Sequence, residues 1–259
     1  MEIIFYKYQG TGNDFVIIDN RQKIFPKNNT KIVAKLCDRR FGIGADGLIL
    51  LEENDEVDFT MVYYNADGNL SSMCGNGGRC IVNFASYLSI IDNSTVFEAV
   101  DGLHQATIEN NIVSLKMTDV DRVEVKENHV FLDTGSPHHV QLVSTLEDLD
   151  VKTEGSKLRY GMYGEKGSNI NFVSMIDSEN FSVRTYERGV EDETFSCGTG
   201  VTAVALAMAE TNKTQSDSVT LHTPGGNLKV SFTKTNSGFS NVFLEGPATL
   251  VFSGTVNIY

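Results

Sequence analysis

The sequence predicts an α+β fold built from two similar halves. Alternating apolar and polar residues indicate many half-buried strands, and two segments have strong helical periodicity. These two segments follow Cys74-Gly75-Asn76-Gly77 and Cys197-Gly198-Thr199-Gly200, which share the pattern Cys-Gly-x-Gly and lie 123 residues apart. The same spacing relates Gly12 to Gly135, Val96 to Val219 and Gly102 to Gly225. A common spacing at four places indicates an internal duplication.

The chain length agrees with this division. A chain of 259 residues fits one large domain or two domains of about 130 residues. We expect one half at 1–120 and a second at 121–250, related by a pseudo-twofold axis. The tail 251–259 is expected to return to the first half.

Local patterns predict the elements in order. Thr30 is expected to cap a helix through Ile32, Val33 and Leu36. The two stronger helices have apolar residues at i, i+3, i+4 and i+7: Ile81, Phe84, Ala85 and Leu88 in one, and Val201, Val204, Ala205 and Met208 in the other. Strands are expected at 130–133, 180–186 and 219–222, and hairpin turns at 110–111, 127–128 and 225–226.

The composition limits the classes of partner that the chain is expected to bind. The net charge of −13 predicts repulsion from nucleic-acid phosphates and acidic membrane surfaces, so we expect neither as a partner. The longest apolar helical stretch, 201–209, is far shorter than the ~20 residues of a membrane span. Four cysteines without a recognisable signal peptide indicate reduced thiols and a cytoplasmic location.

The two Cys-Gly-x-Gly turns carry the predicted chemistry. The first turn of a helix has backbone N–H groups without intrahelical partners and a partial positive charge, and glycines let a ligand approach that backbone. Each turn is therefore a candidate carboxylate site at Gly75-Asn76 or Gly198-Thr199. The same field lowers the pKa of a thiol, so Cys74 and Cys197 are candidates for general acid–base catalysis of an inversion at an α-carbon. The alternative is that both are small buried apolar residues.

Three stretches, GTGNDF, NADGNLSSMCGNGGRC and YERGVEDETFSCGTG, resemble the diaminopimelate epimerase family over essentially the whole chain. The resemblance implies interconversion of LL- and meso-diaminopimelate, in lysine and cell-wall precursor synthesis, by two cysteines without a cofactor or metal. It also implies that each half is a curled β-sheet around a central helix. A small amino-acid substrate is the expected partner, and a homodimer is the assembly considered.

Residue by residue, the resemblance places the base and the acid at Cys74 and Cys197. It implies substrate contacts from Asn13, Asn65, Asn76, Asn171, Glu187 and Arg188, besides the two helix starts. Tyr64, Arg79 and Cys80 are expected to pack or to support the site. The sequence departs from the family pattern at Ser136, where many members have Asn, and at Gly47, where Gln is common.

Three further motifs do not predict a binding site. Gly42 to Gly47 reads G-x-G-x-x-G, but a helix precedes it and a strand follows, which is the reverse of a dinucleotide site. His138-His139 lacks companions at zinc spacing. The acidic run Glu191-Asp192-Glu193 is interpreted as a solvated loop.

The residues alone are also compatible with two other functions. A proline or hydroxyproline racemase also uses two cysteines, although Asn76 and the Glu187-Arg188 pair suit a substrate with a second amino-acid head group. A non-catalytic amino-acid-binding protein would need the glycine-rich amides but no thiol. A related isomerase with a carboxylic acid in place of cysteine is excluded by Cys74.

Overall fold

The computed structural model describes residues 1–27, 29–71 and 73–258. Ser72, in one of the quoted motifs, and Tyr259, at the end of the expected tail, lie outside the described residues. The chain forms two compact units, one of Met1–Leu115 with Pro247–Tyr259 and the other of Lys116–Gly246. The halves expected from the sequence end a few residues later, at 120 and 250.

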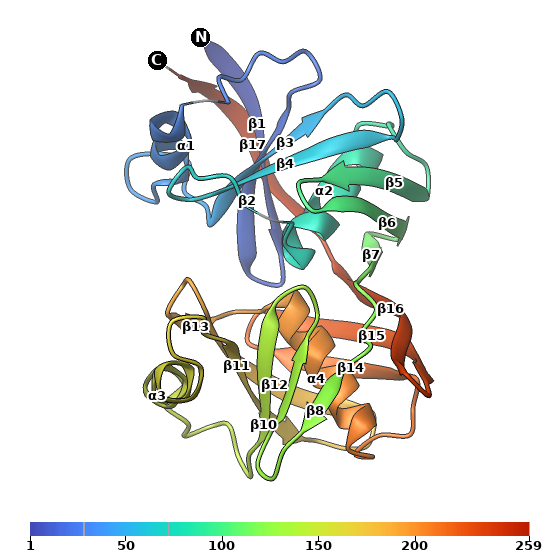
Figure 1. Cartoon of the computed structure of the whole chain (residues 1–259). Helices are drawn as coiled ribbons and strands as arrows, with labels where there is room; N and C mark the ends of the chain where they lie inside the picture. The colour runs from blue at the N-terminus through green and yellow to red at the C-terminus, as the bar shows by residue number, and fades with distance from the viewer. Residues whose placement is uncertain (28, 72, 259) are drawn as a thin grey trace. The chain divides into compact units, whose positions relative to one another are not determined.

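The first unit is one sheet with a helix on each face (Figure 1). Its elements are β1 (Glu2–Gly10), β2 (Asn13–Asp19), α1 (Thr30–Cys37), β3 (Gly47–Glu52), β4 (Phe59–Asn65), α2 (Gly75–Tyr87), β5 (Ser94–Ala99), β6 (Gly102–Glu109), β7 (Ile112–Lys116) and β17 (Thr249–Asn257). The strands pair in the order β17-β1-β2-β3-β4-β5-β6-β7, and the β2–β3 and β4–β5 pairs are parallel.

Helix α2 is the centre of this unit. It contacts β1, β2, β3, β6 and β17, and its residues from Gly75 to Ala85 are buried. A Cβ at Gly77 would lie 3.2 Å from Ile49 and 3.3 Å from Met61, so a glycine lets the helix approach the sheet closely. Helix α1 covers the opposite face of the sheet, where its Val33 and Leu36 belong to a cluster of buried apolar residues.

The second unit has the same plan. Its elements are β8 (Val123–Val125), β9 (Val130–Asp133), β10 (Pro137–Leu142), α3 (Val151–Tyr163), β11 (Asn169–Met175), β12 (Asn180–Glu187), β13 (Asp192–Thr194), α4 (Gly198–Glu210), β14 (Ser218–Thr223), β15 (Gly226–Thr235) and β16 (Gly238–Pro247). The order is β8-β9-β10-β11-β12-β14-β15-β16, with β13 added beside β12. The buried helix α4 contacts most of these strands, and α3 packs on β11, β12 and β13.

The two units therefore share one topology. The parallel pairs β2–β3 and β4–β5 of the first correspond to β10–β11 and β12–β14 of the second. Helices α2 and α4 both have 13 residues, and each follows its cysteine. The predicted α+β fold of two similar halves, each a sheet around a central helix, is confirmed. No helix among the described residues is long and apolar enough to cross a membrane.

The local predictions mostly agree with the structure. Strands form at the three expected places, and Asn110 and Asn111 make the turn between β6 and β7 with φ values of 50° and 64°. The predicted cap at Thr30 was wrong, because Thr30 is the first helical residue of α1. The N-cap is Asn29, whose side-chain oxygen accepts a hydrogen bond from the Ile32 N–H at 3.3 Å.

The acidic run was also interpreted wrongly. Residues 191–193 are half-buried, and β13 begins at Asp192. The Glu193 carboxylate accepts two hydrogen bonds of 2.7 Å from Arg184, and Glu191 pairs with Arg159 at 3.3 Å. Asp192 pairs with Lys152 at 2.5 Å. Cations on α3 and β12 thus pair with all three carboxylates of the run.

Candidate active site

In the first unit the candidate site is the start of α2. Cys74 is the N-cap residue with extended backbone (φ −109°, ψ 132°), and it lies half-buried immediately before the buried Gly75 and Asn76. The first-turn N–H groups of such a helix have no intrahelical acceptors, and the helix dipole makes this end partially positive. The geometry can bind a carboxylate and favours ionisation of a nearby thiol.

Asn13 lies beside this helix start. The Asn13 Oδ1 atom accepts hydrogen bonds from the Cys74 thiol, at 3.6 Å, and from Asn76 Nδ2, at 3.2 Å. The Asn13 Nδ2 group donates to Asp46 Oδ2 at 2.7 Å. Three residues chosen from the sequence therefore meet here, and Asp46, which sequence reasoning missed, joins them.

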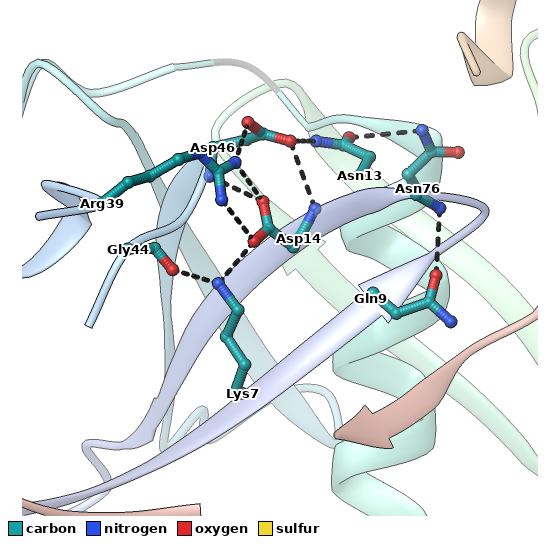
Figure 2. A network of polar contacts seen from close by, with 9 residues as sticks. Lys7, Gln9, Asn13, Asp14, Arg39, Gly44, Asp46 and Asn76 are labelled. Carbon is teal, nitrogen blue, oxygen red and sulfur yellow. Dashed lines mark hydrogen bonds and ion pairs between the residues drawn. The ribbon is translucent and has the colours of Figure 1, made fainter. Parts of the chain in front are cut away.

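Asp46 belongs to a polar network that extends to Lys7 (Figure 2). Arg39 donates to Asp46 at 2.7 Å and to both carboxylate oxygens of Asp14, at 2.7 and 2.9 Å. The buried Lys7 ammonium also donates to Asp14, at 2.5 Å, and to the Gly44 carbonyl. Burial alone would raise the pKa of Asp14, but the hydrogen bonds from Arg39 and Lys7 outweigh it and hold that pKa well below its usual value.

Arg79 supports the site from inside α2, as expected. Its side chain is fully buried, and burial lowers the pKa of the guanidinium. It donates to Asn76 Oδ1 at 3.0 Å, to Thr11 Oγ1 at 3.2 Å and to the Gly75 carbonyl at 3.3 Å. The guanidinium thus fixes Asn76 and the β1–β2 turn in one arrangement.

Asn65 and Gly47 lie opposite each other at the neighbouring end of the β3–β4 pair. Asn65 is exposed there. A Cβ at Gly47 would lie 2.5 Å from the Tyr63 ring and 2.6 Å from the Tyr64 carbonyl oxygen. The departure at Gly47 therefore has a physical reason, because Tyr63 fills the space that a side chain at this position would need.

In the second unit the candidate site is the start of α4. Cys197 is the N-cap residue (φ −126°, ψ 115°) and is buried. Its Sγ atom lies 3.5 Å from Thr199 Oγ1, which in turn lies 2.9 Å from His138 Nε2. Thr134 Oγ1 donates to the Thr199 carbonyl at 2.9 Å, so two side chains hold the first turn of α4.

Asn171 orients His138. Its Nδ2 group donates to the His139 carbonyl at 2.9 Å and faces His138 Nδ1 at 3.1 Å, while its Oδ1 atom accepts from Thr185 at 3.0 Å. Burial, with a smaller contribution from Arg188, lowers the pKa of His138 to about 3, so the imidazole is neutral at pH 7. The amide of Asn171 is the shorter contact and can only donate to Nδ1, which favours the neutral ring with its proton on Nε2, although Asn169 Nδ2 also lies 3.5 Å from Nε2.

Glu187 and Arg188 lie at the end of β12. The Arg188 backbone N–H donates to Asn169 Oδ1 at 2.8 Å, and its guanidinium donates to the Lys166 carbonyl at 2.9 Å and to Ser136 Oγ at 3.4 Å. Asn169 also donates to Ser136, at 3.0 Å. The serine at this departure from the family pattern therefore helps to position Arg188.

The structure brings several of the expected residues together within each unit. Asn13, Cys74, Gly75 and Asn76 lie together in the first, with Asn65 on the adjacent strand end. In the second, Cys197, Gly198 and Thr199 connect to Asn171 through His138. Among the described residues, no cluster of three or more His, Cys, Asp and Glu side chains can hold a metal.

Solved structures share this fold. A phenazine biosynthesis protein of the PhzF family from Bacillus anthracis matches with a TM-score of 0.80 at 14% identity, covering 100% of both chains. A hydroxyproline epimerase from Agrobacterium vitis matches with a TM-score of 0.71 at 14% identity, covering 98% of this chain and 91% of the other. At this identity, both likenesses show the fold of the chain.

A family model and relatives of higher sequence identity identify the family of this chain. The family model described as diaminopimelate epimerase matches residues 5–123 and 130–251. The diaminopimelate epimerase of Flavobacterium psychrophilum is 62% identical over 97% of this chain and 99% of its own. That of Chlorobaculum tepidum is 41% identical over 96% of this chain and 99% of its own. With these relatives, the two units and their cysteines define an isomerase of the racemase and epimerase class. The chain belongs to the diaminopimelate epimerase family.

Proposed function

We propose that this enzyme interconverts LL- and meso-2,6-diaminopimelate, in lysine and peptidoglycan precursor synthesis. The observation that carries the proposal is the repeated Cys-Gly-x-Gly helix start, at topologically equivalent places in two units, in a chain that belongs to this family over nearly its whole length. The family membership favours this substrate over proline, and both thiols favour catalysis over binding alone.

In the proposed reaction, Cys74 and Cys197 carry the two proton transfers at the α-carbon. Inversion needs removal of the α-proton from one face and delivery of a proton to the other, so one cysteine begins as a thiolate and the other as a thiol. The first-turn amides at Gly75-Asn76 and Gly198-Thr199 bind the carboxylate attached to the reacting carbon. Proton transfer between these groups requires no metal or organic cofactor.

The remaining residues are proposed to bind the rest of the substrate. Glu187 pairs with an ammonium group, and Arg188 binds a carboxylate. The amide side chains of Asn13, Asn65 and Asn171 complete the hydrogen bonding to the substrate. The Arg188 guanidinium, held by Lys166 and Ser136, is already in a defined position for this task.

NMR of the protein with LL-diaminopimelate in D₂O tests the proposal, with L-proline as a parallel substrate. We expect the α-proton signal of LL-diaminopimelate to disappear as the meso form appears, and Cys74→Ala and Cys197→Ala to abolish both changes. Exchange into proline alone would assign the racemase activity instead. No exchange into either substrate under reducing conditions would leave a binding protein.

We also propose a cytoplasmic location, since both thiols must stay reduced, and a homodimer. Support for the homodimer comes from β17, which pairs with β1 and has no charged residue in an otherwise acidic chain. Its Val251 and Phe252 are exposed. A long uncharged strand of this kind favours pairing with a second copy, and light scattering of the purified chain would detect the dimer.

A further inference from the structure

The two histidines of β10 face opposite sides of the sheet, because side chains alternate along a strand. His139 contacts α3, since its Nδ1 atom lies 2.8 Å from the Tyr163 hydroxyl. His138 contacts α4 instead, and its Nε2 atom lies 2.9 Å from Thr199 Oγ1. The His138 side chain is fully buried and has no part in the proton transfers proposed above. His138 is therefore a buried group of the candidate site that the proposed reaction does not use.

The surroundings of His138 determine which of its nitrogens carries the proton. Asn171 Nδ2 donates to the His139 carbonyl at 2.9 Å, and a carbonyl can only accept, so this contact fixes the orientation of the amide. The same Nδ2 group therefore donates to His138 Nδ1 at 3.1 Å. Asn169 Nδ2, at 3.5 Å from Nε2, has two closer acceptors at 3.0 and 3.2 Å. The proton of the neutral ring accordingly lies on Nε2.

Thr199 is held from two directions at the start of α4. The His138 Nε2–H group donates to Thr199 Oγ1 at 2.9 Å, and the Thr134 hydroxyl donates to the Thr199 carbonyl, also at 2.9 Å. Because Oγ1 accepts from the ring, the Thr199 hydroxyl uses its own proton to donate. Thr199 is half-buried, so a ligand can reach this donor beside the first-turn N–H groups. A carboxylate is the ligand that such a set of donors favours.

We propose that His138 is a positioning residue for the substrate carboxylate: it donates to Thr199 Oγ1 and so directs the Thr199 hydroxyl proton towards the carboxylate bound at the start of α4. This inference rests on the proposed function, which places that carboxylate at Gly198-Thr199. His138 does not itself touch the substrate, because it acts through one hydroxyl group. Asn171 holds the ring in the orientation that this task requires. The alternative is that His138 only fills the space between β10 and α4.

Long-range ¹H–¹⁵N NMR of the imidazole rings, in the full chain at pH 7, tests the contact without substrate. His138→Gln identifies the His138 signals among those of the five histidines. We expect a neutral His138 ring with its proton on Nε2. Thr199→Val replaces the hydroxyl by a methyl group and should shift the Nε2 signal of His138 but not the signals of His139. A proton on Nδ1, or an unchanged Nε2 signal in Thr199→Val, would overturn the proposal.

Kinetics with LL-diaminopimelate separate hydrogen bonding by His138 from packing. His138→Leu fills a similar space but neither donates nor accepts, so kcat/KM should fall about tenfold, as expected when buried hydrogen bonds are left unmade. His138→Gln presents one acceptor and one donor, as the neutral ring does, and should recover most of this loss. Equal losses in the two variants would mean that His138 acts by filling space, which would overturn the proposal.

A double-mutant cycle shows whether His138 acts through Thr199. Thr199→Val should reduce kcat/KM about as much as His138→Leu does, and the double variant should lose no more than either single variant, because both changes break the same path. Losses that multiply would show that His138 acts independently of the Thr199 hydroxyl, contrary to the proposal. Should His138→Leu not fold, the NMR comparison and the kinetics of His138→Gln and Thr199→Val decide.

His139→Gln is the matched control, because His139 is the other buried histidine of β10 and its partners are Tyr163 and Gln141. It should leave kcat/KM unchanged, and a loss equal to that of His138→Leu would contradict a specific role for His138. The NMR readout is independent of turnover. Absence of exchange by the wild-type chain in D₂O would therefore reject the proposed function, whereas the imidazole signals report the contact between His138 and Thr199 by themselves.

Discussion

The Asn171 carboxamide oxygen lies 2.6 Å from the position that a Cβ of residue 200 would occupy. Gly200 is the last glycine of the second Cys-Gly-x-Gly motif, and Asn171 is the residue that orients His138. A methyl group here would also lie 3.2 Å from the Cys197 Cβ. The glycine is therefore required by the packing of α4 against β11 as well as by access of a ligand to the helix start.

Gly200→Ala should displace Asn171 and with it the Thr199 and Cys197 side chains. We expect at least a tenfold loss of kcat/KM and a loss of about 1–3 kcal/mol in the free energy of unfolding, the usual cost of overpacking. Gly161→Ala in α3 is the control, since a Cβ there meets nothing within 4 Å. It should stabilise the protein by about 0.5–1 kcal/mol at unchanged activity. Equal behaviour of the two variants would contradict the packing argument.

Two buried histidines should make the protein sensitive to mild acid. Burial lowers the pKa of His138 to about 3 and that of His139 to about 4, whereas both titrate near 6.5 when unfolded. Because the unfolded chain binds these protons more tightly, their contribution to stability is complete above pH 6.5 and is lost as the pH falls. At pH 5 the loss is roughly 2 kcal/mol for each histidine.

Urea unfolding at pH 7.5 and pH 5.0 measures this effect. His139→Gln removes one of the two groups, so its free energy of unfolding should fall less between these pH values than that of the wild-type chain. His139 donates to or accepts from Tyr163 and Gln141 rather than the candidate site, so the variant keeps the His138 contacts. An identical fall in both proteins would show that His139 is not buried in its neutral form.

The sequence predicted what local signals determine. The starts of α2 and α4 and their spacing follow from glycines and helical periodicity, and the topology of the second unit follows from the first. Contacts between distant residues could not be predicted this way. Asp46 lies 33 residues from Asn13, and its role depends on a loop whose path the local pattern does not specify. The interpretation of the acidic run at Glu191 as a solvated loop was wrong for the same reason, because the cations that pair with it lie on other elements.

Substitution of Glu193 tests whether the acidic run is held by ion pairs rather than solvated. Its carboxylate receives two hydrogen bonds from Arg184, which also donates to the Leu146 carbonyl at 2.6 Å and thereby ties β12 and β13 to the segment before α3. Glu193→Gln weakens this pairing and should cost about 1–2 kcal/mol in the free energy of unfolding. The exposed Glu127→Gln is the control and should stay within about 0.5 kcal/mol of wild type. A solvated loop would give the same small change in both variants.

Asp14 should contribute more to stability than Asp19, a more exposed carboxylate of the first unit. Its side chain pairs with the buried Lys7 and with Arg39, and these hydrogen bonds hold its pKa well below the value of about 3.9 that it has when unfolded. Asp14→Asn leaves the Lys7 ammonium buried without its ionic partner, which should cost about 3 kcal/mol at pH 7.

The sign of the pH effect distinguishes this ion pair from simple packing. Because the folded pKa of Asp14 is depressed, its contribution is complete above pH 4 and is lost as the pH falls further, so the difference between wild type and Asp14→Asn should shrink from pH 5 to pH 2.5. Asp19→Asn removes the partner of the more exposed Arg21 and should cost less than about 1 kcal/mol. A difference between wild type and Asp14→Asn that is the same at both pH values would mean that Asp14 stabilises the unit by shape rather than by charge.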